Sequence, residues 1–252
     1  MRASRDFTNV INFILDELCP PILRECWPLM YPIYRAAYGK DTARLMRYKD
    51  HYAYLSDEDY GDYYECAGRT GISQRPTDLD RPGVRFVLEN AHGTCLDAGC
   101  GRGWLAKRLA EEGHRVTGLD IAPPPAYAPS DGYAFVQGSL DGLPFPDGSF
   151  DTVICAHVLE HVRDFDRALA ELLRTARERV VIVLPRQREY RYTADLHIRY
   201  FPYLYNIQTA FPMKEAAMGR VGRDWGIVIS KKTEGSSGRG CGAGYQEGEC
   251  PP

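Results

Sequence analysis

The sequence predicts an α/β fold: a doubly wound, Rossmann-like, mostly parallel sheet of about six to seven strands with a helical N-terminal extension. The first observation is residues 94–123, which read as a short apolar run, a glycine turn, a helix-period segment and a second short strand that ends on Asp120. The second is residues 150–156, which are apolar on both faces, as a buried parallel strand should be. A strand–helix–strand unit requires parallel strands, so the glycine turn and Asp120 meet at the carboxyl edge of the sheet.

Composition and charge are those of an ordinary globular chain. At 252 residues it is long enough to bury a large core in one α/β domain with additions. The net charge of −3 argues against a nucleic-acid partner bound through a basic surface. No segment approaches the roughly 18 apolar residues of a membrane span, and residues 1–15 lack the apolar block of a signal peptide. The eight cysteines form no CxxC pair, so we expect a reducing, cytoplasmic location without membrane contact.

Residues 1–90 are expected to form a helical, tyrosine-rich extension. Residues 7–18 have apolar side chains at helical spacing, and a second apolar stretch, residues 22–34, is interrupted by Pro28 and Pro32. Six tyrosines then fall between residues 48 and 64, among acidic side chains. Two interpretations remain open: an amphipathic cap on the sheet with half-buried tyrosines, or a lid whose aromatic and acidic groups line a substrate pocket.

The glycine turn has the features of a nucleoside site. Gly99 and Gly101 lack a Cβ and let a ligand approach the backbone, and the first turn of the following helix offers unpaired N–H groups. Gly113 is placed to end that helix. The third glycine falls at position 103 and Trp104 follows it, so the G-x-G-x-x-G pattern of a dinucleotide site is missing. This weakens the interpretation as a nicotinamide-dependent oxidoreductase.

The later elements follow in order. A proline-rich segment after Asp120 has room for only a brief turn where a helix is usual. We expect a third strand over 133–137, a fourth over 150–156, a helix over 165–177 capped by Asp164, a fifth strand over 179–184, an antiparallel edge strand over 225–230, and a disordered tail over 233–252.

Three segments of the chain resemble motifs of one known family. LDAGCGRGWLAKRLAEEGHRVTGLD, residues 96–120, is similar to the first motif and following acidic position of the class I S-adenosylmethionine-dependent methyltransferases. Residues 139–151 resemble the family's segment between the third and fourth strands, and residues 153–162 its fourth strand and the start of a helix beyond it. The resemblance covers about residues 93–185 and implies a cofactor-binding core over 91–232. Only one C-terminal strand is evident where the family has two, so this end is expected to be abridged.

The resemblance also implies roles for individual residues. Asp97, Gly99 and Gly101 would shape the methionine and ribose side of the S-adenosylmethionine site, with Asp120 on the ribose hydroxyls. Ser139 stands where the family often has an acid, so the adenine amino contact can pass to Asp141 or to backbone. Arg69 and Arg75 are interpreted as surface arginines, with the methionine carboxylate as the alternative. The full set expected at the cofactor is Asp97, Gly99, Cys100, Gly101, Asp120, Ile121, Ser139, Leu140 and Ala156.

Two histidines are the candidate catalytic residues. His157 follows the fourth strand at the carboxyl edge, where a neutral imidazole can take a proton from an acceptor hydroxyl, and packing is the competing interpretation. His197 is the second candidate base, in an aromatic segment after the fifth strand. Residues 157–161 also match H-x-x-E-H, a zinc-protease pattern, but no third ligand is evident. We expect His161 to be structural and no metal to be needed.

The sequence thus predicts an S-adenosylmethionine-dependent methyltransferase acting on a small molecule, with a hydroxyl of a sugar or natural product as the acceptor considered. Oxygen, nitrogen, carbon and sulfur acceptors and a protein substrate all stay open, and the oligomeric state is not indicated. The alternative is a non-catalytic nucleotide-binding or scaffold protein that keeps the fold.

Overall fold

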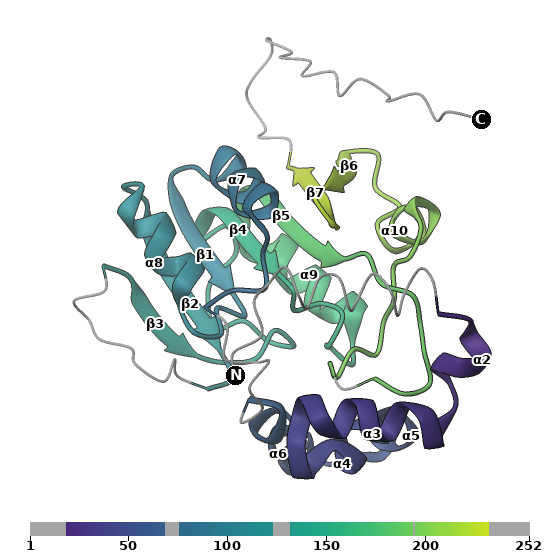
Figure 1. Ribbon diagram of the computed structural model, residues 1–252. Helices are drawn as coiled ribbons and strands as arrows, with labels where there is room; N and C mark the ends of the chain where they lie inside the picture. The colour runs from purple at the N-terminus through teal and green to yellow at the C-terminus, as the bar shows by residue number, and fades with distance from the viewer. Residues whose placement is uncertain (1–18, 69–75, 123–131, 194, 232–252) are drawn as a thin grey trace, which may run out of the picture.

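A computed structural model describes residues 19–68, 76–122, 132–193 and 195–231 (Figure 1). Several predictions concern residues outside these ranges: the helix over 7–18, the two arginines Arg69 and Arg75, the proline-rich turn after Ala122, and the tail over 233–252. Among the described helices, none has both the length and the apolar character needed to cross a bilayer.

A seven-stranded sheet organises the molecule, in the order β3-β2-β1-β4-β5-β7-β6. Its strands are β1 (Thr94–Ala98), β2 (Arg115–Asp120), β3 (Ala134–Gln137), β4 (Phe150–Ala156), β5 (Ala176–Pro185), β6 (Ala216–Val221) and β7 (Asp224–Ser230). Neighbouring strands among β1 to β5 are parallel, and β7 runs antiparallel to both β5 and β6. This confirms the predicted fold class and places the ends of β1, β2 and β4 at one edge.

The C-terminal end of the sheet corrects two expectations. It is not abridged, because β6 and β7 form a hairpin around Gly222, whose φ is +61°. Nor is β7 the edge strand, since β6 lies outside it. The sequence pattern did not predict β6 because an edge strand faces solvent along much of its length. Its residues are half-buried or exposed and form no apolar run.

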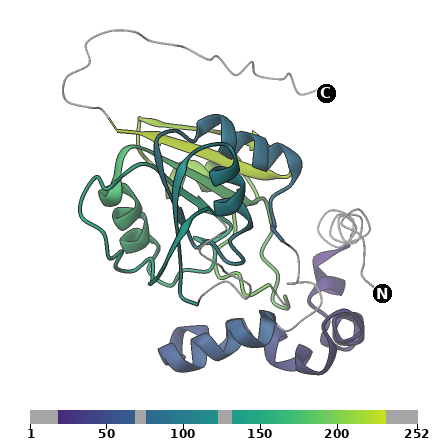
Figure 2. The same ribbon diagram turned by 90° about the vertical axis from the view of Figure 1, so that its left-hand side faces the viewer.

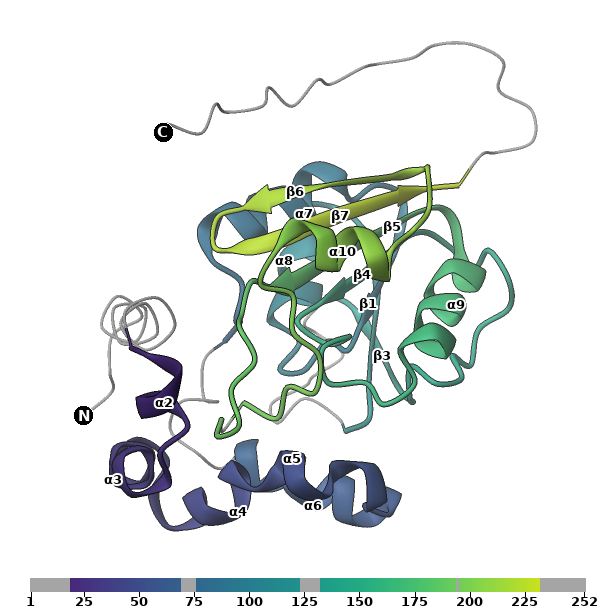
Figure 3. The same cartoon turned by 90° about the vertical axis from the view of Figure 1, so that its right-hand side faces the viewer.

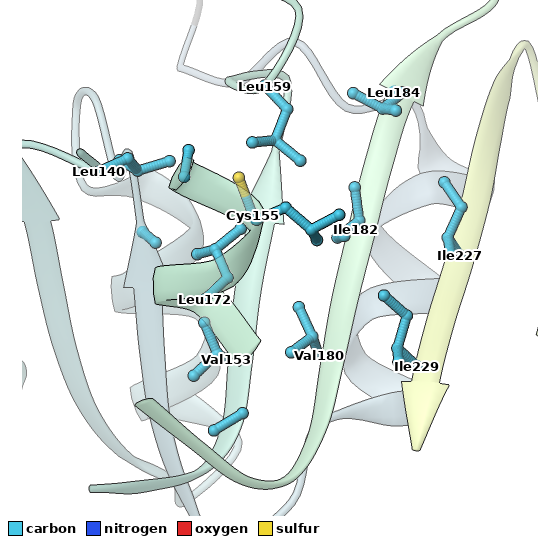
Figure 4. Packing of buried hydrophobic residues seen from close by; sticks show 14 of the residues in the cluster. Leu140, Val153, Cys155, Leu159, Leu172, Val180, Ile182, Leu184, Ile227 and Ile229 are labelled. Carbon is cyan, nitrogen blue, oxygen red and sulfur yellow. The ribbon is translucent and has the colours of Figure 1, made fainter. Parts of the chain in front are cut away.

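Helices cover both faces of the sheet (Figure 1). They are α7 (Arg81–Asn90) and α8 (Trp104–Glu111) on one face, and α9 (Phe165–Thr175) and α10 (Leu204–Ala210) on the other. Because successive strand residues point to opposite faces, Val180 of β5 joins the α9 layer and Val181 the α7 layer. Leu172 of α9 is fully buried in the layer that contains Val153 and Val180 (Figure 4).

The N-terminal helices form a separate layer away from the sheet (Figures 2 and 3). They are α2 (Pro21–Arg24), α3 (Trp27–Tyr38), α4 (Thr42–Met46), α5 (Tyr48–His51) and α6 (Asp57–Gly68), with 3₁₀ turns at Gly39–Asp41 and Tyr52–Tyr54. Both prolines expected to interrupt this region lie inside α3. Pro28 occupies the first turn, where its missing N–H costs nothing, and the helix tolerates Pro32 in its interior.

The core of this helical layer is shared with residues 186–193 and 195–203, the described part of the segment between β5 and α10. Met30, Leu45 and Tyr48 are buried together with Leu196, and Tyr192 packs at the border of the same cluster. The expected cap on the sheet is therefore a layer that packs on this long segment, which Figure 3 shows extending from β5 toward the helices. The tyrosines of this layer differ widely in solvent exposure: Tyr48 is 1% exposed and Tyr54 is 90% exposed.

Candidate active site

The glycine turn between β1 and α8 is tied to the end of β2. The backbone N–H groups of Gly99 and Cys100 donate to the Leu119 carbonyl at 2.7 and 2.9 Å. The next N–H, that of Gly101, donates to Oδ2 of Asp120 at 2.8 Å. The two features that the sequence placed at one edge of the sheet are thus in direct contact.

The three glycines of the turn are needed there for different physical reasons. All have positive φ, between +51° and +81°. A Cβ on Gly99 would lie 2.3 Å from a methyl carbon of Val158, and one on Gly103 would lie 1.9 Å from the Tyr133 hydroxyl. A Cβ on Gly101 would meet no atom within 4 Å. Packing inside the protein therefore requires two of these glycines, and only Gly101 faces open space that a ligand can enter.

Asp97 and Asp120 bring two carboxyl groups to this edge. Asp97 is 2% exposed and its Oδ2 has no hydrogen-bond partner among the described residues. Burial, helped by the charge of Asp120, raises the pKa of Asp97 to about 7 against the opposing N–H of Ala106 in α8. Burial also raises the pKa of Asp120, with the N–H groups of Gly101, Ala122 and Ile121 acting in the opposite direction.

The residues expected around the adenine lie further along the same edge. Ile121 is an apolar side chain that is 46% exposed, and its carbonyl accepts from the Gln137 side chain at 2.9 Å. Leu140 is buried, and the Ser139 hydroxyl accepts from the N–H of Asp141 at 3.2 Å, which fixes the turn after β3. Oδ1 of Asp141 is buried without a hydrogen-bond partner in the described structure.

The two other residues expected at the cofactor are Cys100, in the glycine turn, and Ala156, at the end of β4. The Cys100 thiol is buried, burial raises its pKa, and its sulfur lies 3.0 Å from where a Cβ on Gly118 would be. Ala156 ends β4 beside β1. Cys95 and Cys155 are fully buried and belong to the two core layers of the sheet.

The chemistry of this edge fits a nucleoside with a cationic part. Unpartnered carboxylate oxygens on Asp97 and Asp141 and the Asp120 carboxylate can accept from ribose hydroxyls, an ammonium or an amino group. The half-exposed Ile121 offers an apolar surface to a base. The same carboxylates would repel the negative charges of a dinucleotide's pyrophosphate. S-adenosylmethionine, which carries a sulfonium and an ammonium, therefore fits these residues better than a nicotinamide dinucleotide does.

His157 lies at the end of β4 between two carboxylates. Its φ is +57°, and its N–H donates to the Val183 carbonyl, so residues 157–163 form turns and not the expected helix start. Its Nε2 lies 3.2 Å from Oδ2 of Asp224 and its Nδ1 lies 3.4 Å from Oε1 of Glu160. Burial alone would lower the pKa of His157, but the two carboxylates outweigh burial and raise this pKa well above its usual value. With both ring nitrogens facing acceptors, His157 is poorly placed to take a proton.

His197, the other candidate base, reaches the same carboxylate from the segment between β5 and α10. Its Nδ1 lies 2.6 Å from Oε1 of Gln187, and its Nε2 lies 3.9 Å from Oε1 of Glu160. Glu160 is fully buried, so one carboxylate holds both candidate histidines. Neither Glu160 nor Asp224 has a role that was predicted from the sequence. The glutamate was visible only within H-x-x-E-H, and Asp224 reaches His157 through a hairpin that was not predicted.

A separate groove of about 540 Å³ lies along α7 and α8. Its lining includes Leu88, Trp104 and Arg108 but none of the site residues described above. We base the site on the carboxyl edge of the sheet because the polar groups converge there.

Comparison with known proteins gives this edge a family context. The family described as "Methyltransferase domain" matches residues 96–184. The malonyl-[acyl-carrier protein] O-methyltransferase of Serratia marcescens is 36% identical over 91 residues, 35% of this chain and 36% of that protein. The demethylmenaquinone methyltransferase of Thermus thermophilus is 38% identical over 103 residues, 37% of this chain and 47% of that protein. The matched segment thus spans less than half of either relative.

A solved structure has the same fold over more of the chain. The 1,6-didemethyltoxoflavin-N1-methyltransferase of Burkholderia thailandensis, with 1,6-didemethyltoxoflavin and S-adenosylhomocysteine bound, has a TM-score of 0.58. It covers 73% of this chain and 91% of its own, at 20% sequence identity. The similarity extends well beyond residues 96–184 as a fold.

Proposed function

We propose that this chain is a class I, S-adenosylmethionine-dependent methyltransferase that acts on a small-molecule acceptor, because residues 96–184 match the methyltransferase domain family. The observation that carries the proposal is the contact between the glycine turn and Asp120, next to the unpartnered carboxylate oxygen of Asp97. S-adenosylmethionine, when bound, supplies an electrophilic methyl group on a sulfonium. The protein then has to align donor and acceptor and exclude water.

We propose that the cofactor binds along the carboxyl edge of β1, β2 and β4. Asp120 accepts from the ribose hydroxyls, Asp97 lies toward the cationic methionine part, and Gly101 allows close approach. Ile121 and Leu140 contact the adenine. Asp141 takes the polar contact that the family usually gives to the position of Ser139, because its free carboxylate oxygen lies two residues away.

For a hydroxyl acceptor, we propose His197 as the base and His157 as a positioning residue. The acceptor proton passes to Nε2 of His197, whose Nδ1 already faces Gln187 and, at 3.6 Å, Oδ2 of Asp195. The Glu160 carboxylate stabilises the imidazolium that forms. His157 holds Glu160 in place through its own charge.

The acceptor is proposed to bind between the core and the N-terminal helices. We retain the proposed division into a helical lid over residues 1–90, a core over 91–232 and a tail beyond it. We also propose a cytoplasmic location and no nucleic-acid or membrane partner. The lid is supported by Tyr60, whose hydroxyl donates to the His161 carbonyl at 2.8 Å, so α6 reaches the turn that carries His157. A sugar or natural-product hydroxyl is the proposed acceptor class.

The proposal is tested by following S-adenosylhomocysteine formation with a panel of phenolic, sugar and polyketide hydroxyl acceptors. Turnover with one acceptor class, lost in His197→Gln and in Asp120→Ala, is the expected result. Cofactor binding without turnover on any acceptor would instead favour the non-catalytic scaffold.

A further inference from the structure

Three side chains converge next to the proposed acceptor site: Glu160 is fully buried, and His161 and His197 are half-buried. Glu160, His161 and His197 each offer one ligand atom within 4.8 Å of the others. Glu160 is 0% exposed, and neither of its carboxylate oxygens has a hydrogen-bond partner in the described structure. A fully buried carboxylate without a hydrogen bond is costly. The ion pair with Nδ1 of His157 at 3.4 Å offsets part of this cost, and both oxygens can still accept a ligand.

The two imidazoles are oriented as metal ligands usually are. Nδ1 of His161 lies 3.2 Å from the Leu196 carbonyl, and Nδ1 of His197 lies 2.6 Å from Oε1 of Gln187. When each Nδ1 carries the proton, each Nε2 keeps its lone pair free for a cation. A metal-bound histidine typically donates its other N–H to a carbonyl or carboxamide in this way.

Further contacts hold the three side chains in place. The Gln187 amide donates to Oδ2 of Asp195 at 2.6 Å, and Oδ1 of Asp195 accepts from the N–H of His197 at 3.2 Å. On the other side, the ring of Tyr64 in α6 packs edge-on against His161, with centroids 5.7 Å apart. His157 lies outside the triad and contacts Oε1 of Glu160, where a hydrogen-bond donor to a ligating carboxylate is expected.

We propose that Glu160, His161 and His197 bind a divalent transition-metal ion of the zinc class at the junction between the core and the N-terminal helices. Two imidazoles and a carboxylate are the ligand types that Zn²⁺, Co²⁺ and Fe²⁺ accept, whereas Mg²⁺ prefers oxygen ligands. Bonds of about 2.0–2.2 Å at tetrahedral angles place ligand atoms about 3.3–3.6 Å apart. The three ligand atoms lie within 4.8 Å of one another, so metal binding would draw them together by at most about 1.5 Å.

The site also differs from the H-x-x-E-H pattern in the sequence. That pattern would use His157 and His161 on one helix face, but residues 157–163 form turns and His157 is engaged by Asp224 and Glu160. The third ligand comes from His197, 36 positions after His161, brought near by the segment between β5 and α10. A metal here would join the turn after β4 to that segment, directly beneath α6.

Metal binding is measured on the full chain without a histidine tag, dialysed against a chelator and then titrated with Zn²⁺ and with Co²⁺. We expect one saturable site per chain, and Co²⁺ absorption typical of nitrogen and oxygen ligands, without the charge-transfer band of thiolates. Zn²⁺ at a hundredfold excess over Kd should raise Tm by about 5–10 °C. Binding does not require methyl transfer, so failure of the proposed function would leave this result intact.

Variants locate the ion. Glu160→Gln and His197→Gln should each weaken Zn²⁺ binding by about 100-fold or more, and Gln187→Ala, which removes only the partner of His197, by about 10-fold. His51→Gln, an exposed histidine on α5, is the matched control and should bind as the wild type does. Circular dichroism and Tm without metal show that each variant is folded, and Gln187→Ala keeps the test decisive if Glu160→Gln does not fold.

Absence of 1:1 binding to the folded wild type would overturn the proposal and leave Glu160 as the partner of His157 and His197 without a metal. Binding that survives both Glu160→Gln and His197→Gln would also overturn it. Since a metal-bound His197 cannot accept a proton, metal-loaded and metal-free protein compared in the methyl-transfer assay would show which of its two proposed roles operates.

Discussion

Replacing Asp120 with alanine should weaken S-adenosylmethionine binding by a factor that follows from its contacts. Hydrogen bonds to a charged carboxylate contribute about 1.5–3 kcal/mol each, so two ribose hydroxyls give about 3–6 kcal/mol. Asp120 already accepts from the Gly101 N–H at 2.8 Å, and exchanging that bond for a ligand bond reduces the gain. A net loss of about 2–4 kcal/mol remains, equivalent to about 30-fold to 1,000-fold in Kd.

Isothermal titration calorimetry of wild type and Asp120→Ala with S-adenosylmethionine, S-adenosylhomocysteine and NAD measures this effect. Both sulfur nucleosides share the ribose, so both should weaken by the same factor, and NAD should bind neither protein. Asp120→Asn, which keeps the shape and loses the charge, should fall between. Glu111→Ala on α8 removes an exposed carboxylate and is the matched control.

A folded Asp120→Ala variant that binds both nucleosides within about threefold of wild type would refute the assignment of the ribose to Asp120. Equal loss of binding in Glu111→Ala would instead indicate a general charge effect. Unequal effects on the two nucleosides would mean that Asp120 contacts the methionine part, because only that part differs between them.

Three further predictions concern stability. The folded-state pKa of Asp97 is raised to about 7, so the folded state keeps a proton that the unfolded state loses near pH 4. The free energy of unfolding should therefore fall as pH rises from about 4 to about 7, by up to about 4 kcal/mol. Urea titrations should show this slope in wild type and a flatter one in Asp97→Asn. Gly99→Ala should lower the free energy of unfolding by at least about 2 kcal/mol, because of its φ of +81° and the clash with Val158. Adding Val158→Ala to the same chain should restore only the part of this loss that the clash causes. Full recovery of stability would contradict the contribution of backbone strain. Leu172→Ala in the α9 layer should cost about 2–5 kcal/mol by chemical denaturation, whereas an unchanged midpoint would mean that this layer can collapse around the cavity.

Local sequence patterns identified the central part of the sheet because the forces there are local. The alternation of the strand–turn–helix unit, the Asp164 cap and the glycine that ends α8 each act within a few residues, and the structure has β1, α8, β2 and α9 close to where they were expected. The same patterns failed at β6, where solvent exposure removes the apolar signal, and at α3, where Pro28 in the first turn and Pro32 in the interior were read as interruptions. They also failed after β4, where the Val183 carbonyl and two carboxylates hold His157 in a turn.

The sequence by itself determined the fold class and the acidic, glycine-rich edge at β1 and β2, because a βαβ unit brings these residues together whatever surrounds it. Only the tertiary structure decided what the histidines do. The C-terminal hairpin brings Asp224 to His157, and the long segment after β5 brings His197 to Glu160. A buried carboxylate acquires its partners from whichever segments fold over it, and this information lies in packing across the whole chain.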